Sequence, residues 1–238
     1  MLDARVRLPL AGQIAAKPAT DLPTRIARAG AETAWVVAPT LAQACVALAS
    51  LPSITRVELE LGDLAGLELP DALGGRTLVR VRSRSLAQTR AALALHGDFE
   101  VLAPIDREHA AWIEGLAAWP SRLALIQPSY DLASDAATHD VELAEFCRSL
   151  ARFGEVPVEG VVACLLGRAP RIARAVLDTT MLTPEGGLEI FRYARRFVQA
   201  HDRVKSLRCR TCAYEPSCQG VHVNWVRAHG FAALRPVC

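Results

Sequence analysis

The sequence predicts an α/β fold in which a sheet-containing domain precedes a small cysteine-rich module. Over the first two thirds of the 238 residues, short apolar runs alternate with helical patterns, which is typical of a parallel sheet with crossover helices. The pattern then changes, because Gly167 and Pro170 interrupt it and cysteines gather from Cys209 onward. We expect a sheet domain over residues 1–170 and, over residues 171–238, a helix that leads into the cysteine module.

Each predicted strand is a short apolar or alternating run that ends at a turn residue. After a short apolar run at residues 6–10, the predicted strands cover residues 33–38, 57–61, 78–81, 99–103, 123–127 and 158–166. The predicted helices cover residues 22–29, 40–50, 86–95, 108–118, 141–153 and 183–202. About six strand–helix units are too few for a closed eight-stranded barrel. A partial, open barrel or a doubly wound sheet fits this count.

The last long helix has the clearest start signal in the sequence. Thr183 is a capping residue, Pro184 suits the first helical position, and Glu185 adds an acid in the first turn. The helix is therefore expected to begin at Thr183. Its inward face is expected to hold Leu188, Phe191, Ala194 and Val198.

The composition limits the classes of protein to which the chain can belong. Hydrophobic residues make up 51% of the chain, which is enough for a full core and excludes disorder. No apolar run reaches membrane-spanning length, and the first residues include Asp3 and no long apolar segment, so we expect a cytoplasmic protein. A net charge of +2 and 5% aromatic residues do not indicate a nucleic-acid partner.

Four cysteines near the C-terminal end are candidate metal ligands. Cys209 and Cys212 form a Cys-x2-Cys pair, Cys218 follows, and Cys238 is the last residue. In the cytosol, cysteines clustered in this way are more often metal ligands than disulfides. Their spacing does not separate a structural zinc site from a [4Fe–4S] cluster. Gly220 slightly favours the cluster over zinc, because a glycine lets backbone N–H groups approach the sulfur atoms.

The other cysteines and the histidines are assigned to packing or to the surface. Cys45 and Cys147 lie at helical spacing among apolar residues, which favours the core. Cys164 ends a predicted buried strand, and its spacing alone slightly favours a core role. His222 and His229 lie within the cysteine loop and are expected on the surface or beside the ligands. The remaining histidines are expected at helix ends or on the surface: His96, His109, His139 and His201.

The stretch from Cys209 to Pro236 resembles the auxiliary-cluster region of radical S-adenosylmethionine (SAM) enzymes. It is similar to the SPASM and twitch modules of peptide-modifying members. Those modules have Cys-x2-Cys-x5-Cys-x-Gly, then an aromatic residue, a glycine and a hydrophobic-x-Pro ending. The matching positions here are Cys209, Cys212, Cys218, Gly220, Trp225, Gly230, Leu234 and Pro236. The resemblance implies a partial, open radical-SAM-like β/α barrel that precedes a SPASM/twitch-like module.

Upstream, the resemblance is incomplete. Pro39, Thr40 and Leu41 follow a predicted strand, as in the family's Gly-Gly-Glu-Pro-Thr-Leu, but the Gly-Gly-Glu part is missing. No cysteine precedes Cys45, so the family's Cys-x3-Cys-x2-Cys, which holds the SAM-cleaving cluster, is also missing. The sequence has no G-x-S-x-G, phosphate-loop or H-E-x-x-H motif. We therefore do not expect SAM binding or independent radical SAM catalysis.

The resemblance also implies a ligand set. Cys164 resembles the auxiliary-cluster cysteine that often precedes the family's final helix. This implies one [4Fe–4S] cluster bound by Cys209, Cys212 and Cys218, with Cys164 or Cys238 as the fourth ligand. The implied function is that of a degenerate, accessory protein. It would relay electrons or hold a peptide substrate for an intact radical SAM enzyme in peptide or natural-product maturation.

Two other hypotheses remain open at the level of the sequence. The first is a binding or scaffold protein with a structural zinc ion and no redox chemistry, because zinc accepts the same four thiolates. The second is an active radical SAM enzyme that borrows its missing ligands from elsewhere. Metal content distinguishes the first hypothesis from a cluster protein, and formation of 5′-deoxyadenosine from SAM tests the second.

Overall fold

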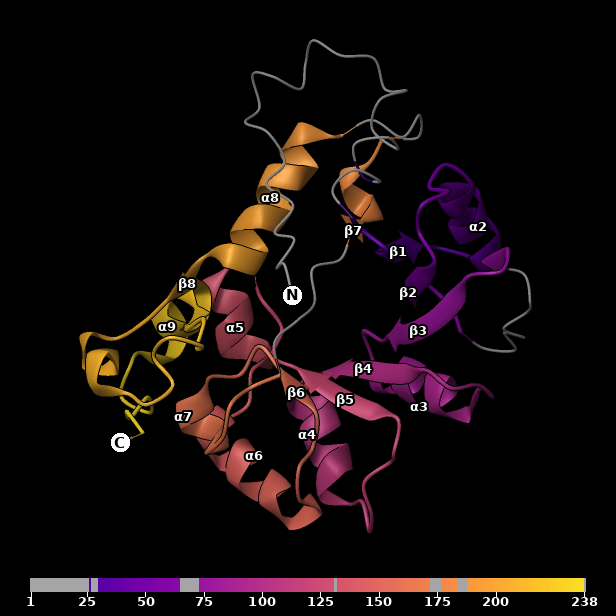
Figure 1. Cartoon of the computed structure of the whole chain (residues 1–238). Helices are drawn as coiled ribbons and strands as arrows, with labels where there is room; N and C mark the ends of the chain where they lie inside the picture. The colour runs from indigo at the N-terminus through magenta and orange to yellow at the C-terminus, as the bar shows by residue number, and fades with distance from the viewer. Residues whose placement is uncertain are drawn as a thin grey trace. The chain divides into compact units, whose positions relative to one another are not determined.

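The computed structural model describes residue 26 and residues 30–64, 73–130, 132–171, 177–183 and 188–237. Within these residues the larger sheet has seven strands in the order β6-β5-β4-β3-β2-β1-β7 (Figure 1). The strands are β1 (Thr33–Ala38), β2 (Arg56–Leu61), β3 (Thr77–Arg82), β4 (Glu100–Pro104), β5 (Leu123–Ile126), β6 (Val158–Glu159) and β7 (Leu177–Asp178). The pairs β1–β2, β1–β7, β2–β3 and β5–β6 are parallel, which confirms the predicted α/β class. A sheet of this kind is compatible with a partial β/α barrel.

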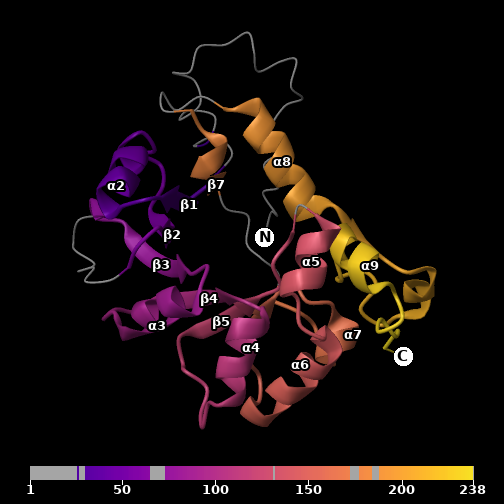
Figure 2. The same ribbon diagram turned by 180° about the vertical axis from the view of Figure 1, so that it is seen from behind.

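Helices alternate with most of these strands, and a small second sheet follows them. The helices are α2 (Leu41–Ala49), α3 (Leu86–Ala94), α4 (Arg107–Glu114), α5 (Ala133–His139), α6 (Leu143–Leu150), α7 (Ala163–Leu166), α8 (Ile190–His201) and α9 (Val223–His229). Strands β8 (Arg203–Val204) and β9 (Val221–His222) pair in antiparallel fashion. Helix α9 packs beside α5, as both ribbon views show (Figures 1 and 2).

The chain divides into two compact units. The first unit consists of residues 1–83, 87–101 and 174–196, and it contains β1, β2, β3 and β7. The second unit consists of residues 84–86, 102–173 and 197–238, and it contains β5, β6 and the two-stranded sheet. The predicted division at residue 170 remains a prediction.

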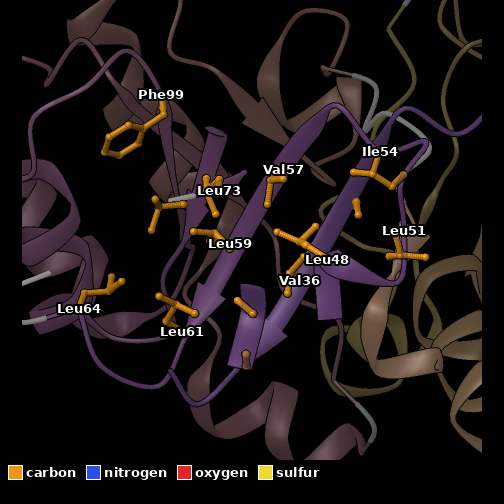
Figure 3. Close-up of a cluster of buried hydrophobic side chains, with 14 of the residues drawn as sticks. Val36, Leu48, Leu51, Ile54, Val57, Leu59, Leu61, Leu64, Leu73 and Phe99 are labelled. Carbon is orange, nitrogen blue, oxygen red and sulfur yellow. The ribbon is translucent and has the colours of Figure 1, made fainter. Parts of the chain in front are cut away.

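The first unit has an aliphatic core on one face of its sheet. Alternate residues of β2, namely Val57, Leu59 and Leu61, are at most 2% exposed (Figure 3). Val36 on β1 and Leu48 on α2 belong to the same cluster. Helix α2 begins where expected, because the Thr40 side chain accepts the Gln43 N–H at 3.3 Å. Such a core provides most of the free energy that holds helices onto a parallel sheet.

Charged side chains of the first unit form a second buried layer. Glu58 on β2 is 4% exposed and pairs with Arg82 at 2.7 Å and Arg80 at 3.4 Å. Asp178 on β7 pairs with Arg196 at 2.7 Å. A buried charge is tolerated when it is paired in this way, so β2 can be buried on both faces although it alternates Val, Glu and Leu.

The second unit brings the ends of its strands to one edge. Strand β5 pairs in parallel with β6, with Leu125 opposite Val158. After β4, Asp106 caps α4 by accepting the His109 N–H at 2.8 Å. The carboxyl ends of parallel strands lie on the same side of a sheet, so the loops after β5 and β6 start from a common edge.

Two sequence predictions about the second half of the chain are wrong. The predicted strand at 158–166 ends at Glu159, because Gly160 has φ +73°, and Cys164 lies on helix α7 instead. The long helix begins at Ile190 rather than Thr183, since Leu182 bridges to Leu188 in antiparallel fashion. The capping signals at Thr183 were outweighed by this short-range bridge.

One further prediction was wrong, one was right only in part, and one helix was missed. Phe191, Ala194 and Val198 are exposed rather than inward, with Phe191 82% exposed. His109 is 0% exposed, because its Nδ1 pairs with Asp106 at 2.8 Å. Helix α5 was not predicted at all. The predictions for residues 6–10 and for all of residues 22–29 except Ile26 lie outside the described residues.

Among the described residues, no helix combines the length and apolar character that crossing a membrane requires. The longest of the described helices, α8, has 12 residues, about 18 Å at the usual rise per residue. The hydrocarbon core of a bilayer is thicker, at about 30 Å.

We predict that the β2 core can be tested with a matched pair of Val→Ala variants. Val57→Ala removes two methyl groups at a fully buried position, so it should lower the free energy of unfolding by about 2 kcal/mol. Val46→Ala acts at a position that is 75% exposed and should change it by less than about 0.5 kcal/mol. Urea denaturation followed by circular dichroism measures both. Equal losses in the two variants would contradict this assignment of the core.

Candidate functional site

Four cysteines of the second unit line one cavity, which we call the thiol cavity. Cys164 comes from α7, whereas Cys209, Cys212 and Cys218 come from the segment between β8 and β9. Apolar side chains supply much of the remaining wall: Val162, Val204, Val221, Leu234 and Pro236. The fold thus brings together thiols that are far apart in the sequence.

Cys164 enters the thiol cavity because the chain turns sharply after β6. Gly160 adopts φ +73°, a conformation that ends the strand and favours glycine. The short helix α7 follows and ends at Gly167, which has φ +70°. Cys164 is the second residue of α7, near the carboxyl end of β6. Loops at this edge of a parallel sheet commonly carry ligand-binding residues.

The Cys-x2-Cys pair is held by a tight turn. The 3-10 helix Leu207–Thr211 carries Cys209, and the Ser206 side chain caps it by accepting the Arg208 N–H at 3.3 Å. The Cys212 N–H then donates to the Cys209 carbonyl at 3.0 Å, which closes the turn. Cys218 lies on a second turn, where its N–H donates to the Tyr214 carbonyl at 2.8 Å.

Two backbone N–H groups point at sulfur atoms of the thiol cavity. The Gly220 N–H donates to Cys218 Sγ at 3.4 Å, and the Val237 N–H donates to Cys212 Sγ at 3.5 Å. The Ala213 N–H donates to the Val237 carbonyl at 2.7 Å, so the C-terminal segment is fastened to the cysteine turn. Hydrogen bonds to sulfur favour the thiolate form, which is the form that binds metals.

Gly220 is required both by its conformation and by its surroundings. It has φ +82°, and a Cβ atom at this position would overlap the carbonyl oxygen of Val204. Val204 on β8 is paired with Val221 on β9. The close approach of β8 to Gly220 therefore sets the position of Cys218.

The thiols of the cavity influence one another electrostatically. Burial, followed by the charges of Cys218, Cys209 and Cys212, raises the pKa of Cys164 to about 11. Ionising Cys164 beside the other three sulfur atoms requires a positively charged group that offsets burial and repulsion. A thiolate-binding metal or cluster has this property, so the donor set fits such a group chemically.

The remaining predicted site residues have a mixed outcome. Within the described residues, no three His, Cys, Asp or Glu side chains form a group that could hold a single metal ion. Cys238 lies outside the described residues. Cys147 is buried on α6, and burial raises the pKa of its thiol to about 12, as suits a core residue. Cys45 on α2 is half-buried. The ligand assignment itself remains a prediction.

The structure also reveals a polar cluster that sequence reasoning missed. Asp140, which is 6% exposed, contacts His229 Nε2 on α9 at 3.2 Å, and the Asn224 side chain donates to the Tyr130 carbonyl at 2.8 Å. Burial raises the pKa of Asp140 to about 6, although His229 and Tyr130 favour its charged form. These residues are separated by long stretches of sequence, so no local motif could reveal them.

Comparison with protein-family models, with curated proteins and with solved structures finds no match to this chain. The family resemblance noted in the cysteine module therefore enters only as a proposal.

We predict that Gly220→Ala is more damaging than Gly230→Ala. Both glycines have positive φ, so each substitution should lower the free energy of unfolding by about 1–3 kcal/mol through backbone strain. A Cβ on Gly230 meets nothing within 4 Å, whereas one on Gly220 overlaps the Val204 carbonyl. Gly220→Ala should therefore show an additional loss in urea denaturation. Equal losses would show that β8 does not constrain this turn.

We predict that Asp140 makes the second unit less stable as pH rises. The folded pKa, about 6, exceeds the ordinary value of 3.8, so the folded chain binds more protons between these values than the unfolded chain. The free energy of unfolding contributed by Asp140 is thus greatest below this window and is lost as pH rises through it.

Asp140→Asn removes this titrating group, whose charged neighbours include His229 and His139. The variant should lose less stability than the wild type between about pH 4.5 and about pH 6.5. Urea denaturation at both pH values measures the difference. Asp202→Asn, at an exposed position, should retain the wild-type pH dependence. A steeper loss in Asp140→Asn would reverse the assigned sign.

Proposed function

We propose that this chain binds one [4Fe–4S] cluster and serves as an accessory protein to an intact radical SAM enzyme. The observation that carries the proposal is the thiol cavity, where Cys164, Cys209, Cys212 and Cys218 line a common space. Each iron of a [4Fe–4S] cube binds one thiolate, so the ligands of such a cluster surround a cavity. Four thiols around one space match that requirement in number and in chemical type.

The surroundings of the thiols support a cluster ligand set. Backbone N–H groups of Gly220 and Val237 donate to sulfur atoms of Cys218 and Cys212. Hydrogen bonds of this kind are a principal means by which proteins tune the potential of iron–sulfur clusters. Val221 and Leu234, at 0% and 4% exposed, supply apolar walls of the cavity.

We assign the fourth ligand to Cys164. Cys164 lines the same cavity as the other three, and its pKa responds to their charges. Cys238 is the other candidate for the fourth ligand from the sequence. It directly follows Val237, whose N–H donates to Cys212 Sγ. The two assignments are separated by metal analysis of the corresponding variants.

The accessory role is inferred from the auxiliary-cluster motif that the sequence retains and from the initiating cysteine motif that it lacks. The resemblance covers the auxiliary-cluster region from Cys209 to Pro236, whereas no cysteine precedes Cys45 to form an initiating site. A bound [4Fe–4S] cluster would supply one-electron transfer. The residues of the thiol cavity would hold and shield it while a partner enzyme acts on a peptide substrate.

Metal analysis of the anaerobically purified full chain tests the proposal. We expect about four irons and four sulfides per chain, and a reduced state that is visible by electron paramagnetic resonance. Stoichiometric zinc without iron would overturn the proposal in favour of a structural zinc site. Incubation with SAM and dithionite should produce no 5′-deoxyadenosine. Its formation would contradict the accessory role.

We predict that Cys164→Ala loses the intact cluster. Removing one of four thiolates should reduce the iron content to about three per chain or less, whereas Cys45→Ala, outside the cavity, should retain the wild-type content. Cys238→Ala should resemble the wild type. If Cys238→Ala lost iron while Cys164→Ala did not, the fourth ligand would be Cys238.

A further inference from the structure

We infer that Arg203 is a positioning residue that raises the reduction potential of the cluster by placing a positive charge behind Cys218. This inference rests on the proposed function, because it concerns the same thiol cavity. It adds a regulatory property that neither the cysteine spacing nor the family resemblance supplies. Its basis is the set of contacts between Arg203 and two glycines.

The guanidinium group of Arg203 occupies a fixed place in the second unit. Its Nη1 atom donates to the Gly160 carbonyl and to the Gly220 carbonyl, each at 3.0 Å. A Cβ atom on Gly160 would lie 3.3 Å from Nη2 of Arg203. Both glycines have positive φ, at +73° and +82°. The backbone is therefore shaped around the guanidinium group.

Gly220 links this cation to a cluster ligand. Its carbonyl accepts from Arg203, while its N–H donates to Cys218 Sγ at 3.4 Å. The charge of Arg203 thus lies behind the residue that hydrogen-bonds the sulfur atom. Hydrogen bonds to the sulfur atoms and nearby charge both influence the potential of an iron–sulfur cluster.

The charge of Arg203 is not neutralised by a carboxylate in the described part of the chain. Its hydrogen-bond acceptors are the two glycine carbonyls, and none of the described acids forms an ion pair with it. Burial lowers the pKa of Arg203, whereas the charge of Cys218 opposes that shift. Gly220 is therefore the residue that connects this cation to the sulfur atom of Cys218.

The sign of the effect follows from the charges. A [4Fe–4S]²⁺ cluster with four thiolates carries a net charge of about −2, and uptake of one electron makes it about −3. A nearby cation stabilises the more negative state more strongly. Arg203 therefore favours the reduced cluster. In a redox titration, dithionite supplies the electron that reduces the cluster, and an added oxidant accepts it when the cluster is reoxidised.

Two other cations of the module, Lys205 and Arg210, differ from Arg203 in their surroundings. Lys205 forms an ion pair with Glu215 at 3.0 Å. Arg210 lies between the ligands Cys209 and Cys212 in the sequence but is exposed. Water and salt screen an exposed charge, so Arg210 should have little influence on the potential. It provides a control that is closer to the ligands in sequence than Arg203 but exposed.

Redox titration of the reconstituted full chain, followed by electron paramagnetic resonance, tests this inference. Arg203→Gln should shift the midpoint potential of the cluster to a more negative value than in the wild type. Arg203→Lys keeps the charge but cannot donate as a planar fork, so its shift should be smaller. Arg210→Gln should leave the potential unchanged.

An Arg203→Gln potential equal to that of the wild type would overturn the inference. A shift of the same size in Arg210→Gln would also overturn it, because any lost charge would then suffice. If Arg203→Gln fails to load iron, Arg203→Lys is compared with Arg203→Met, which lacks the charge. Equal midpoint potentials in the Lys and Met variants would refute the role of the Arg203 charge. A wild-type chain without iron would instead refute the proposed function, so the two failures are distinguishable.

Discussion

The thiol cavity depends on one tether, the pair of hydrogen bonds from Arg203 to the carbonyl groups of Gly160 and Gly220. Gly160 belongs to the turn that leads from β6 to Cys164, and Gly220 follows Cys218. The tether therefore holds the two parts of the cavity against each other. A guanidinium group is suited to this task because its donors have a fixed planar arrangement.

The same arrangement has an electrostatic consequence. Burial, together with the neighbouring thiols, raises the pKa of Cys164 to about 11, so the neutral form of that thiol is favoured. A cation or an iron–sulfur cluster would reverse this preference by binding thiolates. The first unit follows a related principle, since Glu58 is tolerated at 4% exposure only beside Arg80 and Arg82.

Sequence patterns predicted the elements whose structure is decided locally. The strand at Thr33–Ala38 and the helix capped by Thr40 match, because hydrophobic periodicity and capping act over a few residues. The helix expected at Thr183 begins later, at Ile190, and Leu182 bridges to Leu188 instead. The inward face assigned to that helix failed as well, because periodicity indicates an apolar face but not whether a neighbouring element covers it.

The sequence by itself determined the α/β class and the thiol-rich character of the C-terminal module, because both follow from residue types at short spacing. Only the tertiary structure decided that Cys164 joins the cavity and that Arg203 bonds Gly160 and Gly220, because these contacts link residues from separate elements. Sequence spacing alone slightly favoured a core position for Cys164. The turn at Gly160 and the pairing of β8 with β9 bring it beside the other thiols.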